Sequence, residues 1–159
     1  MRWVQVTRAD KAARLIADRH YNRQKIGSRQ FVPPGRCLVL LSSCEKALWI
    51  TSWPFAEYVK HAWAGAWVCS AFRNEGAGLS SELIREAVSA SRAFWPTPPL
   101  GMVTFVDRTK VRQKKNPGYC YLMAGFSPCG ETLGGLLALQ LMPDKMPDPI
   151  PCLQRQLAF

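Results

Sequence analysis

The sequence has no long apolar run and no closely spaced pair of cysteines, and each absence argues against a class of protein. No stretch of about 18 consecutive apolar residues occurs, so we expect no membrane-spanning segment. The first residues, 1–6, lack the long apolar core of a signal peptide, and we therefore expect a cytoplasmic protein. The six cysteines include no C-x-x-C pair. The absence of such a pair argues against a zinc site. A disulfide framework is not expected either, in a chain this long without a signal peptide.

Acidic residues are also scarce. The chain carries 11 Asp and Glu against 21 Lys and Arg, a net charge of +10. A basic surface suits a polyanion such as DNA or RNA, although solubility or an anionic cofactor would account for it too. The basic residues gather in two stretches, 22–36 and 108–115, which we expect to be loops that contact phosphates. The candidate DNA-binding residues are Arg23, Lys25, Arg29, Arg108, Lys110, Arg112, Lys114 and Lys115.

With 159 residues, the chain predicts a single domain. We assign residues 1–142 to it and expect the proline-rich residues 143–159 to form a tail packed on it. Alternating and helical periods predict an α/β protein with a mixed twisted sheet. The expected elements are a strand at 3–7, a helix from about Ala9 to 19 or 20 capped by Thr7, a hairpin of 37–41 with 47–53, a strand at 65–72, a helix at 79–94, a strand at 100–106, a short helix at 117–124 ended by Gly125, and a final strand or strand pair within 130–141.

The strand, loop and helix of residues 65–95 form the central unit of this prediction. Its loop reads Arg73-x-x-Gly76-x-Gly78, and Ser80 and Ser81 follow at the helix start. Glycines let a backbone approach a ligand closely, and a helix N-terminus favours negative charge. The loop is therefore a candidate cofactor-phosphate site, and an ordinary β–α turn is the alternative.

Three further stretches carry side chains suited to chemistry. His20 and Tyr21 follow the first helix, where they could bind a metal, relay a proton or stack on a base, or simply cap and pack. Asp107 follows a buried-type strand, at the end where α/β sheets place ligands, and it could be a general base, a metal ligand or an acceptor that fixes its loop. Tyr121 lies in the short aromatic helix, two residues from Tyr119, and at least one of the two is expected in the core.

The loop resembles the acyl-CoA pyrophosphate loop of the GNAT N-acyltransferase superfamily. Taken with the other motifs, the chain resembles the Mom family of phage DNA-modifying proteins over roughly residues 18–140. The motifs that carry this resemblance are His20-Tyr21, the segment 71–74, the segment 79–84, the segment 104–107 and the segment 118–126.

This resemblance implies a GNAT-like fold and a DNA-modifying activity. Mom-like proteins convert adenine in double-stranded DNA to a carbamoylmethylated form at the exocyclic amine, which protects the DNA from restriction. The family's functional residues would fall on His20, Tyr21, Asp107 and Tyr121, with its essential arginine at Arg73 and its serine at Ser80. The family is linked to acetyl-CoA-type binding and to iron, for which His20, Tyr21 and Asp107 form a hard N/O ligand set.

We expect the target adenine to be flipped out of the duplex into a pocket near these residues, because its amine is otherwise buried in the base stack. Two other readings stay open. One is a conventional GNAT acetyltransferase acting on a small-molecule or protein amine, and the other is a basic DNA-binding module without catalysis. The sequence leaves the choice between monomer and dimer open.

Overall fold

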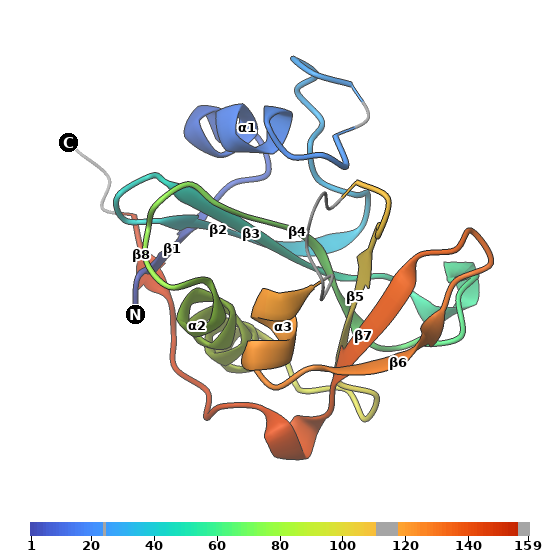
Figure 1. The fold of residues 1–159 in the computed structure, drawn as a ribbon. Helices are drawn as coiled ribbons and strands as arrows, with labels where there is room; N and C mark the ends of the chain where they lie inside the picture. Colours follow the sequence, from blue (N-terminus) through green and yellow to red (C-terminus); the bar gives the residue numbers. More distant parts are fainter. Residues whose placement is uncertain (24, 111–117, 156–159) are drawn as a thin grey trace.

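A mixed β-sheet forms the centre of the protein (Figure 1). The structure is a computed structural model that describes residues 1–23, 25–110 and 118–155. Within these residues eight strands follow the order β6-β7-β5-β4-β3-β2-β1-β8. Their bounds are β1 (Trp3–Val6), β2 (Arg36–Ser42), β3 (Ala47–Trp53), β4 (Trp67–Asn74), β5 (Met102–Val106), β6 (Ser127–Glu131), β7 (Leu137–Leu141) and β8 (Leu153–Gln154).

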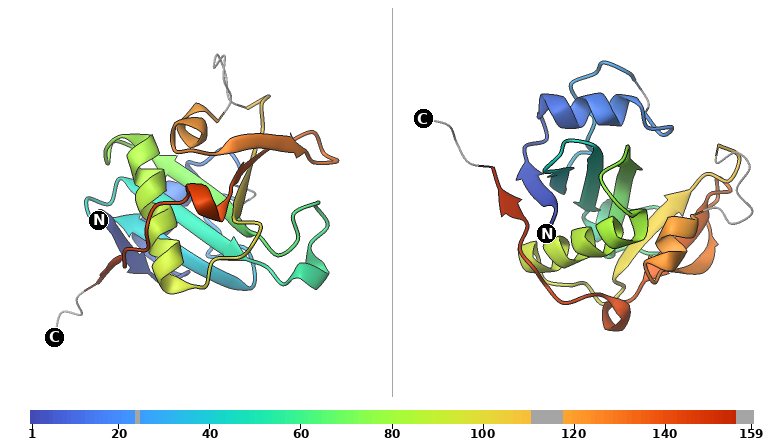
Figure 2. Two further views of the ribbon diagram at one scale, coloured as in Figure 1. Left: turned by 90° about the horizontal axis from the view of Figure 1, so that it is seen from below. Right: turned by 60° about the vertical axis from the view of Figure 1, so that its left-hand side comes forward.

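Helices cover both faces of this sheet. Helix α1 (Lys11–Asp18) lies on one face, whereas α2 (Ser80–Phe94) and α3 (Tyr119–Met123) lie on the other (Figures 1 and 2). Two short 3-10 helices, η1 (Ala56–Tyr58) and η2 (Pro143–Lys145), lie in connecting segments. The predicted α/β class, with a mixed sheet in one domain, is confirmed.

Helix α2 owes its position to its apolar stripe. Leu83, Ile84, Ala87 and Val88 recur at helical spacing and are all completely buried. They pack in a core cluster with the largest aromatic side chains of the sheet. The Trp3 indole also donates a hydrogen bond to the Leu83 carbonyl at 2.8 Å, which ties β1 to α2.

Most predicted elements form within a few residues of the expected places, and two details differ. The helix α1 is capped by Asp10, whose side chain accepts from the Ala13 amide, so the prediction of Thr7 as its cap is wrong. Asp10 is the N-cap because it directly precedes the first helical turn, where its carboxylate reaches the free amides. At the end of α3 the capping residue is Ala124, and Gly125 follows it with φ 106°.

The described part of the tail, residues 143–155, packs against the domain. It runs along α2 on its way from β7 to β8 (Figure 2). Ile150 N–H donates to the Ser89 carbonyl at 3.1 Å, and Arg92 donates to the Pro147 carbonyl at 2.6 Å. The sequence did not predict β8, which pairs parallel to β1 at the sheet edge. No helix among the described residues is long and apolar enough to cross a membrane.

Candidate active site

The parallel strands β4 and β5 diverge toward their carboxyl ends. They pair only over Trp67–Cys69 and Met102–Thr104, after which β4 stays with β3 and β5 stays with β7. The register between β3 and β4 shifts so that Ser70 has no partner, and such a bulge bends a strand. The resulting gap opens at the carboxyl end of the parallel pair, where open α/β sheets hold ligands.

A thiol and a phenol lie at the base of this gap. The Tyr121 hydroxyl is 3.7 Å from Cys69 Sγ, and the Thr104 hydroxyl donates to the Cys69 carbonyl at 3.3 Å. Burial raises the pKa of Cys69 to about 12 and raises the pKa of Tyr121 well above its usual value. Both groups are therefore protonated at neutral pH, so Cys69 is a poor nucleophile and Tyr121 is a weak acid that can still donate a hydrogen bond.

His20 closes the gap from the side of β4. Its Nε2 lies 3.1 Å from the Phe72 carbonyl, while Nδ1 lies 2.5 Å from Asn22 Oδ1 and 3.2 Å from the Asn22 amide nitrogen. Burial lowers the pKa of His20, and the positive charge of Arg73 lowers it further. The two oxygen acceptors favour the protonated ring instead. The net effect is a lowered pKa, so the His20 ring is neutral at pH 7.

Tyr21 and Asp107 meet across the gap. The Tyr21 ring stacks on His20 with centroids 4.5 Å apart, and its phenol faces the Asp107 backbone. Burial raises the pKa of Tyr21. The Asp107 carboxylate turns toward its own loop, where it accepts from the Thr109 hydroxyl at 2.6 Å and amide at 3.0 Å, and these bonds lower its pKa. His20, Tyr21, Asp107 and Tyr121 therefore lie around one end of the sheet.

These residues, as placed, do not fit a metal centre. Both ring nitrogens of His20 already face protein partners, and the Asp107 carboxylate is bound to Thr109. Across residues 1–23, 25–110 and 118–155, no three side chains of the His, Cys, Asp or Glu type come together in a way that would hold a metal ion.

The loop between β4 and α2 is organised by Asn74. Its side-chain oxygen accepts from the amides of Gly76 at 3.1 Å and Ala77 at 2.9 Å. Its side-chain nitrogen donates to the Gly78 carbonyl at 2.7 Å and the Ser80 hydroxyl at 2.9 Å. Two amides expected to bind phosphate are thus used inside the loop. The sequence analysis missed Asn74, although an Asn before a glycine turn is a known sign of such bonding.

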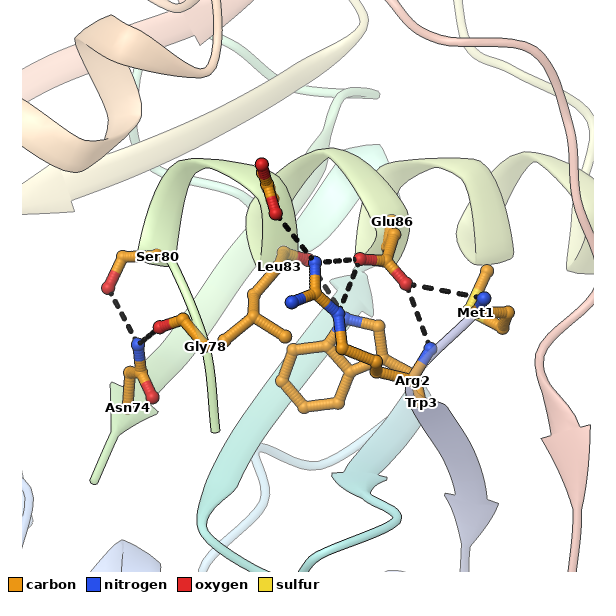
Figure 3. A network of polar contacts seen from close by, with 9 residues as sticks. Met1, Arg2, Trp3, Asn74, Gly78, Ser80, Leu83 and Glu86 are labelled. Carbon is orange, nitrogen blue, oxygen red and sulfur yellow. Dashed lines mark hydrogen bonds and ion pairs between the residues drawn. The ribbon is translucent and has the colours of Figure 1, made fainter. Parts of the chain in front are cut away.

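The first turn of α2 keeps its amides directed outward. Its N-cap residue is Leu79, which is exposed and has no hydrogen-bonding side chain, so the amides of Ser80, Ser81 and Glu82 have no side-chain cap. Gly78 has φ 144°, and a Cβ there would lie 2.5 Å from Arg2 Nη1. Figure 3 shows this arrangement, with Arg2 bound to Glu86 beside the loop. An uncapped helix start of this kind has free amides and a positive dipole end, which are features that favour an anion such as phosphate.

Arg73 lies in a three-membered ion-pair group. Glu75 accepts from Arg73 Nε at 2.7 Å and from Arg19 at 2.6 and 2.7 Å. The hydrogen bonds from Arg19, followed by those from Arg73, lower the pKa of Glu75 to about 2. The group connects the end of α1 to the start of the glycine loop. No local pattern in the sequence indicated that Arg19 and Glu75 would meet.

A cavity of about 600 Å³ opens beside His20 on the α1 face of the sheet. It is bounded by the segment 20–34 on one side and by β3 and β4 on the other. Its volume lies within the range of small-molecule sites, roughly 300–1,000 Å³. Its lining includes His20, Asn22, Lys25, Phe31, Ser70 and Ala71.

The predicted DNA-binding residues have different surroundings. Lys25, Arg29 and Lys110 are exposed, and Arg108 is exposed but pairs with Glu131. Arg23 differs from them, because its side chain is only 8% exposed and binds Asp18. It supports the loop rather than presenting charge to a ligand. Three further predicted residues lie outside the described part of the chain: Arg112, Lys114 and Lys115.

Comparisons of the chain with protein-family models, with curated proteins and with solved structures found no match.

Proposed function

We propose that the protein modifies adenine in double-stranded DNA at the exocyclic amine, producing a carbamoylmethylated base that protects the DNA from restriction. The observation that carries this proposal is the placement of His20, Tyr21, Asp107 and Tyr121 around the gap between β4 and β5. The Mom resemblance assigns function to these same four residues. The exposed cations Lys25, Arg29 and Lys110 support DNA as the partner.

A GNAT-like fold and a phosphate-bearing donor of the carbamoylmethyl group belong to the same proposal, because a plain acyl donor would form an amide with the amine instead. The first turn of α2, at Ser80 and Ser81, would hold the donor's phosphate, and Gly76 and Gly78 shape the loop in front of it. Arg2, which the sequence analysis did not name, lies against Gly78, where its guanidinium already pairs with Glu82 and Glu86. When bound, the donor supplies the group that becomes attached to the base.

The side chains around the gap then divide the proton transfers. The exocyclic nitrogen forms a bond to the methylene carbon of the transferred group, the bond from that carbon to the leaving group breaks, and the nitrogen loses one proton. The neutral ring of His20 would accept this proton at Nδ1, which requires the base to replace Asn22 there. The donor's leaving group gains a proton, and the Tyr121 hydroxyl, which lies 3.7 Å from Cys69 Sγ, would hydrogen-bond to that group and pass on its proton as negative charge develops there. Tyr21 stacks on His20 and holds its ring in position.

The test is the nucleoside content of plasmid DNA from bacteria that express the protein. Digestion and mass spectrometry should show a modified deoxyadenosine with the wild-type protein. Tyr121→Phe removes only the phenol oxygen and should lower the yield about 100-fold, the usual contribution of a general acid. Tyr119→Phe is the matched control, because Tyr119 lies on the same helix with an exposed side chain. Unmodified DNA with the wild-type protein would refute the proposal.

A conventional acetyltransferase is the second candidate, and the uncapped helix start beside diverging strands favours it. It predicts turnover of acetyl-CoA without DNA. In both candidates a donor that extends along β4 would have to displace Asn22 and His20, because these residues already bind the carbonyls of Ser70 and Phe72. A DNA-binding module without catalysis predicts salt-sensitive binding and unaltered nucleosides.

A further inference from the structure

We propose that Ile26 is an apolar wedge that enters the base stack when an adenine is flipped out of the duplex. This inference rests on the proposed function, and it assigns a step of recognition to a residue outside the gap between β4 and β5. Ile26 lies in the segment 20–34 that borders the cavity on the α1 face.

Ile26 is unusually exposed for its type, with 75% of its surface accessible. A single exposed apolar residue is common on protein surfaces and carries little meaning alone. Here, however, the backbone beside it is held in place: the Gly27 amide donates to Asp18 at 3.1 Å. A side chain that gains nothing from burial in the protein is thus presented on a supported backbone.

The segment is supported by the ion pair of Arg23 with Asp18, whose side chains are mostly covered. Arg23 donates to Asp18 Oδ1 at 2.8 Å, to the Gln30 carbonyl at 2.9 Å and to the Ser28 carbonyl at 2.5 Å. One arginine therefore holds both sides of the segment that carries Ile26. Such bracing fits an apolar side chain that must keep its position while it presses on stacked bases.

The charge around Ile26 fits duplex DNA. Lys25 and Arg29 are exposed on either side of it along the chain. Asp18, the carboxylate nearest to the segment in sequence, is already paired with Arg23. Cations next to an apolar tip can bind the phosphates that flank a base step while the apolar group faces the bases.

The cavity lies next to the proposed wedge. Lys25 and Ser28 contribute to its lining, and they immediately surround Ile26 and Gly27 in the chain. On the far side the cavity reaches His20 and Ser70 at the bulged strand. A base displaced by Ile26 would therefore have a space of about 600 Å³ beside His20. Filling the vacated position in the stack offsets part of the cost of unstacking.

The experiment measures flipping without requiring any chemistry. Duplexes carry 2-aminopurine in place of adenine in every combination of flanking bases, and the fluorescence of 2-aminopurine rises when it leaves the stack. Binding is followed separately by anisotropy of an end label. The variants are Ile26→Ala and Ile26→Leu, with Ile150→Ala as the matched control because Ile150 is also exposed but lies on the tail beside α2.

We expect wild type to raise the fluorescence in at least one context. Ile26→Ala should bind within about twofold of wild type, because phosphate contacts provide most of the affinity, yet lose about fivefold or more of the fluorescence rise. Ile26→Leu and Ile150→Ala should retain it. An equal fluorescence rise with Ile26→Ala, an equal loss with Ile150→Ala, or no rise with wild type would overturn the wedge.

The same measurements separate this inference from the proposed function. If plasmid DNA contains no modified adenine but 2-aminopurine still leaves the stack in an Ile26-dependent way, the wedge is upheld and the chemistry is wrong. If adenine is modified equally by wild type and Ile26→Ala in cells, the chemistry is upheld and the wedge is wrong.

Discussion

The two faces of the sheet are built differently. The face under α2 and α3 holds a large cluster that includes the buried indoles of Trp3, Trp49 and Trp67. The face under α1 holds a smaller, mainly aliphatic cluster, to which α1 contributes only Ala13, Ile16 and Ala17 as buried residues. The cavity of about 600 Å³ opens on this second face.

The difference divides the protein into a densely packed face, under α2, and a face with a cavity, under α1. Bulky side chains fill the α2 face, so α2 rests on a densely packed core. Small residues on α1 leave room on the other face, where polar contacts of the segment 20–34 take over its support. A lower density of apolar contacts also lets a region adapt to a ligand more easily.

Two isoleucines test the comparison most strongly. Ile84 lies in the large cluster and Ile16 in the small one, and both are buried to within 1%. Ile84→Ala should lower the free energy of unfolding by about 4 kcal/mol, and Ile16→Ala by about 2 kcal/mol, because a less densely packed site relaxes around the lost atoms. Urea denaturation followed by circular dichroism gives both values. Equal losses would show that the two faces are packed alike.

The second-largest effect is expected when the contacts that support the segment 20–34 are removed. Arg23→Ala removes the ion pair to Asp18 and two bonds to carbonyl groups, and should cost about 2 kcal/mol. It should also speed cleavage of this segment by a protease. Lys25→Ala is the control: it should change stability by less than about 0.5 kcal/mol while weakening DNA binding. If Arg23→Ala left both stability and cleavage unchanged, polar contacts would not support this face.

The smallest effect on stability is expected for Glu75, which pairs with Arg19 at the end of α1 and with Arg73 on β4. Its pKa is lowered from 4.5 to about 2 in the folded protein. The ionised carboxylate therefore stabilises the fold above about pH 4.5, and this contribution is lost as the pH falls toward about 2. Glu75→Gln should flatten the decline of stability across that range. Glu57→Gln, on an exposed residue of η1, should keep the wild-type slope.

Local sequence patterns predicted most of the elements and less of the site. The spacing of Leu83, Ile84, Ala87 and Val88 was enough for α2, because a helical stripe is a property of neighbouring residues. The strand β8 was missed, since Leu153 and Gln154 pair with β1 from the opposite end of the chain. Contacts of that range leave no local period.

The candidate site shows the same division. The sequence singled out His20, Tyr21, Asp107 and Tyr121 as separate candidates. For Asp107 the structure shows the loop-fixing role among the three expected, since its carboxylate accepts from Thr109. It ranked Arg23 with the surface cations, whereas burial beside Asp18 makes it a supporting residue. The roles of Asn74, Arg2 and Glu75 follow only from their contacts in the folded chain.

By itself the sequence determined the α/β class, the basic charge and the strand, loop and helix of residues 65–95, because these follow from composition and from periods within single segments. The tertiary structure alone decided that β4 and β5 separate beyond Cys69 and Thr104 and that a cavity remains beneath α1. It also decided that Ile26 is exposed beside that cavity. These features depend on how side chains from distant segments share space, and only the packed chain fixes that.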